Sequence, residues 1–510
     1  MAKVASFLSL AGLTLDRNAK SALHRQLYLA LQQDILQGRL RPGTRLPPTR
    51  DLAKELGVSR NTITKAYELL WDEGYLESKI GSGTRVNATL PESMLNIEEG
   101  QQFDVEASVQ GEELLEPPLS HQVHHLQESY SEQALQTYVQ PQGGARAFSP
   151  TLPAVDLFPK KLWEKLLLAA WRSLNHSDLG YQSPQGYRPL REALANYMQR
   201  ARGVRCRPEQ IIITSGTQQA LSMICQVLLN PCDSVWLEDP SFPGIQVALG
   251  AAQARSVPVA VDDEGFVLEA ALRHDSKAKM VYISPSHQYP TGVTMSLRRR
   301  LELLQWAQDE GAWIVEDDYD SEFRYSGPPL AALQGLDMAG RVIYIGTFSK
   351  VLFPALRIAY MVVPESLVGV MGTARASVDR CQSVLEQVVL SNFISEGHFA
   401  RHIRRMRTIY AERQSYFVAL AQRELGEWLD VQEKSCGLHL ACTFKVDVDD
   451  EEVARVLRTA GIEAPALSSF SRGNFQGSGL VIGYAAVAKD ETAYALNTMR
   501  EVLRRGYPSC

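Results

Sequence analysis

The sequence has no long apolar segment and no closely paired cysteines. It contains no run of about 18 apolar residues, which argues against a membrane-spanning helix, and residues 1–20 lack the pattern of a secretory signal. The seven cysteines are scattered without a CxxC pair, which favours reduced thiols over disulfides or a metal centre. We therefore expect a soluble cytoplasmic protein without a metal site. Its 510 residues, 45% of them apolar, allow two or more domains with sizeable cores.

Positive charge is absent from one internal segment. Residues 89–145 contain no Lys or Arg and ten acidic residues, whereas residues 1–88 contain 13 Lys and Arg and eight acidic residues. Since the internal segment is also poor in aromatic residues, residues 89–148 are predicted to form an acidic flexible linker, in which a short helix over 126–138 is compatible with the sequence. No metal site is assigned to its histidines, His121, His124 and His125. The basic segment before it favours a polyanion as partner.

Three helices are predicted in the basic segment. Apolar residues recur at helical spacing in residues 21–37, 49–56 and 59–72, and the last two segments are separated by a Gly57-Val58 turn. Thr49 and Ser59 are in position to cap these two helices. Helix, short glycine turn and helix form the helix-turn-helix signature, and residues 71–86 are predicted to form a two-stranded wing.

The third helix indicates which side chains are available to DNA. Its apolar residues recur at i, i+3, i+4 and i+7 and should face inward, which leaves the polar residues near its amino end to contact bases and phosphates. The predicted DNA-binding residues are Arg50, Arg60, Asn61, Thr62, Thr64, Lys65 and Arg85. Residues 41–86 resemble the winged helix of GntR-type bacterial regulators, including the segments Leu-Pro-x-x-Arg and Val-Ser-Arg-x-Thr. The resemblance implies double-stranded DNA as partner.

Strand and helix patterns alternate in the rest of the chain. Strands are predicted over residues 210–214, 234–237, 280–283, 313–315, 342–345 and 359–363. This alternation predicts an α/β fold with a mostly parallel sheet. From about Phe393 a smaller α+β lobe is expected, with a helix over 402–420 and strands over 439–444 and 480–484.

The strand at 342–345 is followed by Gly346-Thr-Phe-Ser-Lys350. Ligands of open α/β sheets bind outside the carboxyl ends of strands, so Lys350 is expected to face a cleft. A lysine accompanied by the hydroxyls of Thr347 and Ser349, with Arg357 seven residues further on, suits a Schiff base to a phosphorylated aldehyde cofactor. A surface lysine after a strand is the alternative for this motif alone.

Other strand ends supply groups that one cofactor could unite. Ser215, Gly216, Thr217 and Gln218 lead from a strand into a helix, where free amides and the helix dipole favour phosphate. Phe242 lies in a proline-rich turn and could stack on a flat heterocycle. Asp317 and Tyr319 follow a strand; such a carboxylate keeps a pyridine nitrogen protonated, and a phenol can bond a ring hydroxyl.

Together these motifs resemble fold type I pyridoxal phosphate enzymes of the aminotransferase class, over residues 149–490. The resemblance implies that Lys350 forms the Schiff base with pyridoxal 5'-phosphate and that Phe242 stacks on the ring. It implies that the phosphate is held by Thr347, Ser349, Arg357 and residues 215–218. It also implies that Asp317 meets the ring nitrogen and Tyr319 the ring hydroxyl, although Asp318 could be confused with Asp317. Tyr181 matches a tyrosine that reaches the phosphate of the other subunit, which implies a homodimer.

The combination of segments resembles the MocR/GabR-type bacterial regulators over nearly the whole chain. The motifs Ser-His-Gln-Tyr-Pro-Thr-Gly, Glu-Asp-Asp-Tyr-Asp-Ser-Glu-Phe and Gly-Thr-Phe-Ser-Lys are typical of that group. The expected domains are therefore a winged helix-turn-helix over 1–88, the linker over 89–148 and a fold type I, aminotransferase-like domain over 149–510.

Two departures from the aminotransferase pattern bear on function. Tyr289 stands where aminotransferases have the asparagine that bonds the ring hydroxyl, so Gln288 or His287 could replace it. The strand at 480–485 contains no arginine, whereas the comparable strand of those enzymes carries a carboxylate-binding arginine, and the loop residue Arg472 could substitute. Loss of this bidentate clamp argues against ordinary amino acid transamination.

We therefore predict a pyridoxal phosphate-dependent transcription regulator that senses a small amine, an amino acid or a B6 vitamer and binds an operator with repeated half-sites. A genuine aminotransferase with an accessory DNA-binding module is the first alternative. The second is a body that has lost the cofactor and serves only dimerisation. An aminotransferase-like half-reaction remains compatible with the regulator.

Overall fold

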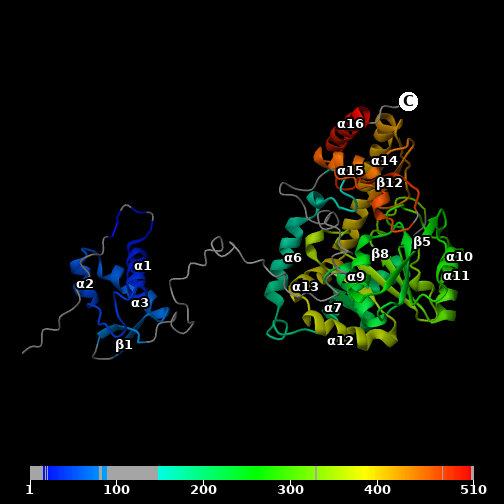
Figure 1. Ribbon diagram of the computed structural model, residues 1–510. Coiled ribbons are helices and arrows are strands. Elements are labelled where there is room, and N and C mark those ends of the chain that lie inside the picture. The colour runs from blue at the N-terminus through cyan, green and yellow to red at the C-terminus, as the bar shows by residue number, and fades with distance from the viewer. Residues whose placement is uncertain are drawn as a thin grey trace, which may run out of the picture. The chain divides into compact units, whose positions relative to one another are not determined.

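The computed structural model describes residues 15–17, 19, 21–79, 83–88, 147–327, 330–473 and 475–506. The chain divides into two compact units, with the division near residue 117 (Figure 1). The predicted linker lies outside the described residues except for its last two, as do the helix considered at 126–138 and the three histidines. Among the described helices, none is long and apolar enough to cross a membrane.

The N-terminal unit is a three-helix bundle with a β-hairpin. Its elements are α1 Leu23–Leu36, α2 Thr49–Glu55, α3 Arg60–Asp72, β1 Leu76–Lys79 and β2 Gly83–Val86. The two strands pair antiparallel, with Leu76 opposite Val86. The inward residues predicted for the third helix, Ile63, Ala66, Tyr67 and Leu70, are all buried. The arrangement is a winged helix-turn-helix.

The helix caps of this unit were predicted with mixed success. Ser59 caps α3, because its side chain accepts a hydrogen bond from the backbone N–H of Thr62. The prediction for Thr49 was wrong: the N-cap position of α2 is Pro48, no side chain caps the helix, and Thr49 is its first residue. Proline at 48 has a fixed φ near that of a helix, so the helix begins one residue earlier, at Thr49, than it would with a threonine cap at 49.

An eight-stranded sheet forms the centre of the C-terminal unit, in the order β3-β10-β9-β8-β7-β4-β5-β6. The strands are β3 Ile211–Thr214, β4 Ser234–Asp239, β5 Arg255–Asp262, β6 Gly265–Phe266, β7 Met280–Ile283, β8 Trp313–Asp318, β9 Val342–Thr347 and β10 Ala359–Val362. Five of them, β5, β4, β7, β8 and β9, are parallel neighbours, whereas β10 is antiparallel to both β9 and β3. The sheet is therefore mixed. Strands β5 and β6 were not predicted.

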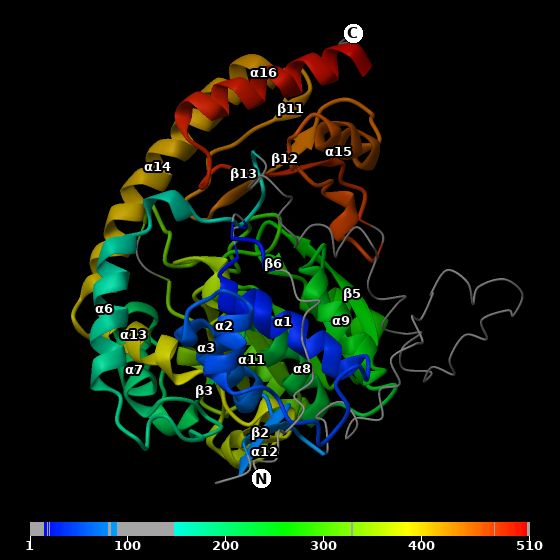
Figure 2. The same cartoon turned by 90° about the vertical axis from the view of Figure 1, so that its left-hand side faces the viewer.

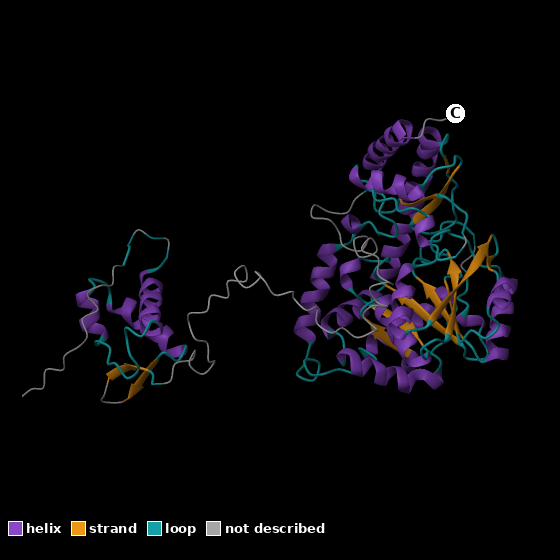
Figure 3. Cartoon of the chain, in the orientation of Figure 1, coloured by secondary structure: helices purple, strands orange, loops and turns teal. Residues whose placement is uncertain are grey.

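Helices cover both faces of this sheet (Figure 3). They are α6 Lys160–Ser173, α7 Arg188–Arg202, α8 Thr217–Leu228, α9 Pro243–Ala252, α10 Leu268–His274, α11 Leu297–Glu310, α12 Val368–Asp379 and α13 Val384–Ser395. Short 3-10 helices occur at Val155–Leu157, Pro208–Gln210, Gln334–Leu336, Pro354–Leu356, Glu365–Leu367 and Ser468–Phe470. Separate apolar clusters lie under α8, α9 and α12 and under α10 and α11. The strands other than β5 are buried on both sides, as is usual where helices cover both faces of a sheet.

The smaller lobe follows α14 His398–Leu425 and lies at the end of the unit opposite α12 (Figure 1). It contains an antiparallel sheet of β11 Leu429–Asp430, β12 His439–Phe444 and β13 Gly479–Gly483, with helices α15 Asp450–Thr459 and α16 Lys489–Gly506. In Figure 2, α14 runs from the lobe along the side of the unit.

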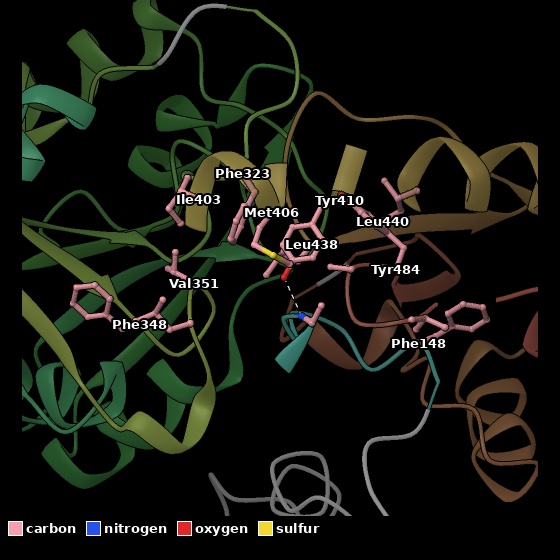
Figure 4. Packing of buried hydrophobic residues seen from close by; sticks show 14 of the residues in the cluster. Phe148, Phe323, Phe348, Val351, Ile403, Met406, Tyr410, Leu438, Leu440 and Tyr484 are labelled. Carbon is pink, nitrogen blue, oxygen red and sulfur yellow. Dashed lines mark hydrogen bonds between the residues drawn. The ribbon is translucent and has the colours of Figure 1, made fainter. Parts of the chain in front are cut away.

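One apolar cluster continues from the large sheet into the lobe. Figure 4 shows Phe323 and Phe348 on the sheet side and Leu438 and Leu440 on the lobe side, with α14 residues between them. The hydroxyl of Tyr410 on α14 accepts a hydrogen bond of 2.9 Å from the backbone N–H of Ala154. This shared core fixes the lobe beside the carboxyl ends of the strands.

Candidate functional site

The predicted DNA-binding residues gather around the amino end of α3. Arg60, Asn61 and Lys65 are exposed, and so is Arg50 in α2. Arg60 Nε donates to the hydroxyl of Thr49 (3.3 Å), which links α3 to α2. These four side chains can reach a duplex without any change in the core.

The other three predicted DNA contacts are partly engaged within the protein. The Thr62 hydroxyl lies 2.9 Å from the Ser59 hydroxyl, and Thr64 Oγ1 donates to the carbonyl of Arg60 (3.0 Å). Arg85 on the wing donates to the carbonyl of Gly43 (3.0 Å). Each is half-buried. Their polar atoms therefore orient the recognition helix and the wing as well as facing solvent.

Strand register brings the predicted phosphate-binding residues of the C-terminal unit to one edge of the sheet. Ala359 of β10 pairs with Thr347 of β9 on one side and with Thr214 of β3 on the other. The segment 215–218 after β3 and the segment 347–350 at the end of β9 are therefore neighbours. Ser349 N–H donates to Thr347 Oγ1 (3.2 Å), which closes the turn that precedes Lys350.

Gly216 leaves room for an arginine at this edge. It has a φ of +134°, and a Cβ atom built on it would lie 2.7 Å from Arg357 Nη2. The guanidinium of Arg357 thus lies against the backbone at the start of α8, where the helix amides are free. An exposed arginine beside a helix amino end is a suitable cradle for a phosphate group.

Lys350 lies in an environment that favours its neutral amine. Burial lowers the pKa of Lys350 to about 8, the charges of Asp320 and Asp317 oppose this shift, and Arg357 adds to it. An amine must be unprotonated to attack an aldehyde, so a lowered pKa makes more of it reactive near neutral pH. Of the two adjacent aspartates of β8, it is Asp317 whose charge acts on the pKa of Lys350.

The two adjacent aspartates of β8 have different partners. Asp317 accepts a hydrogen bond from Tyr282 (2.5 Å), and its other oxygen, Oδ1, is buried without a partner among the described residues. Burial raises the pKa of Asp317 to about 7, which the Tyr282 hydrogen bond and the charge of Lys350 oppose. Asp318 instead forms a buried ion pair with Arg202 (2.8 Å) and accepts from Tyr344 (2.7 Å). The structure therefore separates the aspartate facing Lys350 from one that stabilises the fold.

Tyr319 belongs to a buried network beside this site. Its hydroxyl lies 3.0 Å from Nδ1 of His287, which also lies 3.0 Å from Oδ1 of Asp320. The ring of Tyr319 stacks at 6.4 Å on that of His439. Local sequence patterns do not indicate this network, because its members come from three separate parts of the chain.

The side-chain amide of Gln288 is already hydrogen-bonded within the protein. Its Nε2 donates to the carbonyls of Pro240 (2.7 Å) and Tyr289 (2.8 Å), and its Oε1 accepts from the backbone N–H and the hydroxyl of Thr291. These bonds hold the turn that follows β7. We therefore interpret Gln288 as a residue that supports the turn, in place of the direct ring contact expected from the sequence.

Phe242 and Tyr181 differ in how the structure places them. Phe242 precedes α9, is half-buried, and lies close to Gln218, whose amide donates to the carbonyl of Gly244 (2.9 Å). Tyr181 is 85% exposed, and the guanidinium of Arg380 lies 5.3 Å from its ring centroid. Within one chain, Tyr181 is thus not part of the site around Lys350.

The strand in which the carboxylate clamp was expected is apolar. Leu480, Val481 and Ile482 of β13 are all fully buried. The alternative, Arg472, has an exposed side chain, and its backbone N–H donates to Asp239 Oδ1 (2.9 Å). The strand itself therefore supplies no arginine, and Arg472 stays a prediction from the sequence.

These residues fit a pyridoxal phosphate group. The unpartnered Oδ1 of Asp317 can accept the ring N–H, the space at Gly216 admits the phosphate beside Arg357, and Lys350 supplies an amine for the aldehyde. The bound cofactor supplies an electron sink for carbon atoms attached to an amine. The protein residues would orient it, neutralise its phosphate and keep its ring nitrogen protonated.

Gly216→Ala is expected to weaken cofactor binding about 10- to 100-fold, because its Cβ would displace Arg357 and the backbone conformation is strained. Equilibrium dialysis with pyridoxal phosphate measures the change. Gly369→Ala in α12 is the matched control, since a Cβ there meets nothing within 4 Å. Equal affinities of the two variants would contradict this account of the cradle.

A winged helix-turn-helix joined in one chain to a sheet with this lysine site defines a DNA-binding protein with an aminotransferase-like domain. The family model for bacterial regulatory proteins of the gntR family matches residues 23–86, and that for aminotransferase class I and II matches residues 156–499.

Curated relatives share both regions. The chain is 40% identical to the "Probable rhizopine catabolism regulatory protein MocR" of Rhizobium meliloti over 96% of this chain and 95% of that protein. It is 28% identical to the "HTH-type pyridoxine biosynthesis transcriptional regulator PdxR" of Corynebacterium glutamicum, over 97% and 99%. The chain belongs to the MocR-type family of helix-turn-helix transcription regulators, in which a GntR-type DNA-binding region is joined to a pyridoxal phosphate-binding, aminotransferase-like region.

Solved aminotransferases share the fold of the C-terminal unit. Kynurenine aminotransferase of Pyrococcus horikoshii aligns with a TM-score of 0.66 at 28% identity, over 79% of this chain and 98% of that one. The α-aminoadipate aminotransferase LysN of Thermus thermophilus, complexed with N-(5'-phosphopyridoxyl)-L-leucine, aligns with a TM-score of 0.66 at 26% identity, over 74% and 98%. The prediction of a fold type I aminotransferase-like domain with pyridoxal phosphate as cofactor is confirmed.

Proposed function

We propose that the site around Lys350 senses a small effector and that its binding alters how the winged helices hold DNA. The observation that carries this proposal is a site with the lysine, the unpartnered aspartate and the phosphate cradle, but without a carboxylate-binding arginine in the apolar strand β13. Such a site can bind the cofactor and an amine while lacking the main clamp of an amino acid transaminase.

The proposed roles follow the geometry described above. Lys350 binds the cofactor aldehyde, Asp317 its ring nitrogen and Tyr319 its ring hydroxyl, and Phe242 stacks on the ring. The phosphate is held by Ser215, Gly216, Thr217, Gln218, Thr347, Ser349 and Arg357. We propose domain limits of 1–88, 89–148 and 149–510, which the matched ranges 23–86 and 156–499 support.

The effector is proposed to be a small amine, an amino acid or a B6 vitamer. The names of two relatives refer to rhizopine catabolism and to pyridoxine biosynthesis. These names support small-molecule metabolism as the regulated process. We place the protein in the bacterial cytoplasm, where its DNA target lies.

A homodimer is proposed from the exposed apolar side chains near Tyr181. Trp171 is 61% and Leu179 is 63% exposed, and both line one groove with Tyr181. Large apolar patches on a surface mark interaction sites. A second copy would bury this patch and bring its Tyr181 to the phosphate cradle of the first. Two winged helices then require an operator with repeated half-sites.

A titration of candidate amines and vitamers tests the proposed function when cofactor absorbance and operator affinity are followed in one sample. Coupling between the two sites of about 1–3 kcal/mol changes operator affinity about 5- to 150-fold. An effector that changes the absorbance at saturation but leaves DNA affinity unchanged would contradict the regulatory role.

A genuine aminotransferase is the second candidate, favoured by the lowered pKa of Lys350 and the position of Asp317. Steady release of keto acid from several amino acids would support it. The absent arginine predicts that this turnover is slow. Cofactor binding by the family removes the remaining alternative, a body without pyridoxal phosphate.

In the winged helix, Arg60→Ala is expected to weaken binding to every duplex and to lower the slope of log affinity against log salt by about 0.9, because one phosphate contact is lost.

Asn61→Ala should instead relax sequence choice, at a cost of about 1–3 kcal/mol for the preferred base pair. Fluorescence anisotropy with matched and scrambled operators separates the two effects. Sequence preference that survives in Asn61→Ala would rule out base contact by this residue.

A further inference from the structure

An exposed basic surface on the C-terminal unit takes no part in the proposed cofactor site. It consists of six exposed side chains on α6 and α14, which we call the basic ridge. Its members are Lys160, Lys161, Lys165, Arg401, Arg404 and Arg405. The sequence showed a basic helix in this region, and neither the cofactor nor the apolar patch around Tyr181 accounts for it.

Aromatic contacts join the two halves of the ridge. The ring of Phe158, two residues before α6, lies 6.0 Å from the ring of His402 on α14, and Trp163 of α6 lies 5.5 Å from Phe393 at the end of α13. Helix α13 contacts both α6 and α14. The start of α6 and the first turn of α14 are therefore close to each other, and both carry exposed basic side chains.

The arginines of the basic ridge repel one another. Residues 398–408 contain four arginines and no acidic residue, and Arg401 and Arg405 are four residues apart on one helix face. Like charges at this spacing repel each other and destabilise a helix. Among the described residues no ion pair neutralises a ridge side chain; Glu164 is exposed on α6, and Glu396 binds His398 at 3.0 Å. An external polyanion would offset this repulsion.

We propose that the basic ridge binds the phosphate backbone of operator DNA outside the half-sites read by the winged helices. The same chain binds DNA through its GntR-type region, so bound DNA stays at high local concentration near the ridge. Residues 89–146 can span up to about 200 Å when extended. Arg401 and Arg405 are separated by about 6 Å along the helix axis. They can therefore meet separate phosphates, whose charges repeat about every 3.4 Å on each strand.

The test uses the full-length, cofactor-loaded protein and an operator selected from random duplexes. It compares a short fragment that ends at the half-sites with a long fragment that extends beyond them. The triple variant Arg401→Ala, Arg404→Ala and Arg405→Ala is expected to lower the salt slope by about 2–3 on the long fragment and to leave it unchanged on the short one, at about 0.9 for each lost phosphate contact. The control triple, Arg273→Ala, Lys277→Ala and Lys279→Ala, removes the same charge from exposed positions elsewhere and should change neither slope.

Replacing the three arginines of the ridge by lysine guards against an effect of misfolding. This variant should keep most of the salt slope, since the contact depends on charge. Equal slopes for the alanine triple and its control on the long fragment would overturn the proposal, as would equal losses on both fragments. Loss of binding to phosphatidylglycerol vesicles with unchanged DNA binding would assign the ridge to a membrane surface instead.

Discussion

Lys350→Ala is expected to abolish covalent attachment of pyridoxal phosphate and the response of DNA binding to effector, while operator affinity in the absence of effector stays unchanged. The amine of Lys350 is the group that reaches the cofactor aldehyde, and its lowered pKa keeps it reactive. The variant should therefore also lose the coupling between effector binding and operator binding, which changes operator affinity about 5- to 150-fold. Borohydride reduction followed by mass measurement of the peptide, together with anisotropy on the operator, reports both properties.

The control for this experiment is Lys277→Ala, an exposed lysine between α10 and β7 that should leave every signal at the wild-type level. The winged helix is a separate compact unit with its own apolar core, so loss of a side chain in the C-terminal unit should not unfold it. An effector response that persists in Lys350→Ala would show that sensing occurs away from the cofactor. Reductive labelling of any other lysine would move the site itself.

Asp317→Asn and Asp318→Asn are expected to have opposite effects, although the two residues are adjacent. Asp317→Asn should weaken pyridoxal phosphate binding about 10- to 150-fold, since a hydrogen bond to a charged group contributes about 1.5–3 kcal/mol. Its folding stability without cofactor should not fall, because a buried carboxyl is replaced by a neutral group of the same shape. Asp318→Asn should leave Arg202 buried without a counter-charge, at a cost of about 3–5 kcal/mol in stability.

Two measurements distinguish the aspartates: cofactor affinity by equilibrium dialysis and thermal melting of the cofactor-free protein. Asp318→Asn should melt at a clearly lower temperature yet retain the absorbance of the bound cofactor. If Asp318→Asn instead lost the cofactor while Asp317→Asn kept it, the assignment of the ring-facing residue would be reversed. Similar losses in both variants would mean that the two carboxylates act as one unit.

Much of the fold was accessible from local patterns. The strands β7 and β12 were predicted with the bounds that the structure has, because apolar runs flanked by turn residues mark buried strands. Strand β5 was missed because its burial is uneven and it contains Pro258. The antiparallel direction of β10 could not be predicted, since a buried run of apolar residues has the same pattern in either direction.

The sequence by itself determined the order of the regions, the winged helix and the chemistry at the strand ends, because each of these depends on residues only a few positions apart. The tertiary structure alone decided which of two adjacent aspartates faces Lys350. Arg202 lies 116 residues before Asp318 and reaches it through packing of α7 against the sheet. The placement of Gln288, Tyr181 and the basic ridge likewise depends on such distant contacts, and no local pattern records which segments will meet.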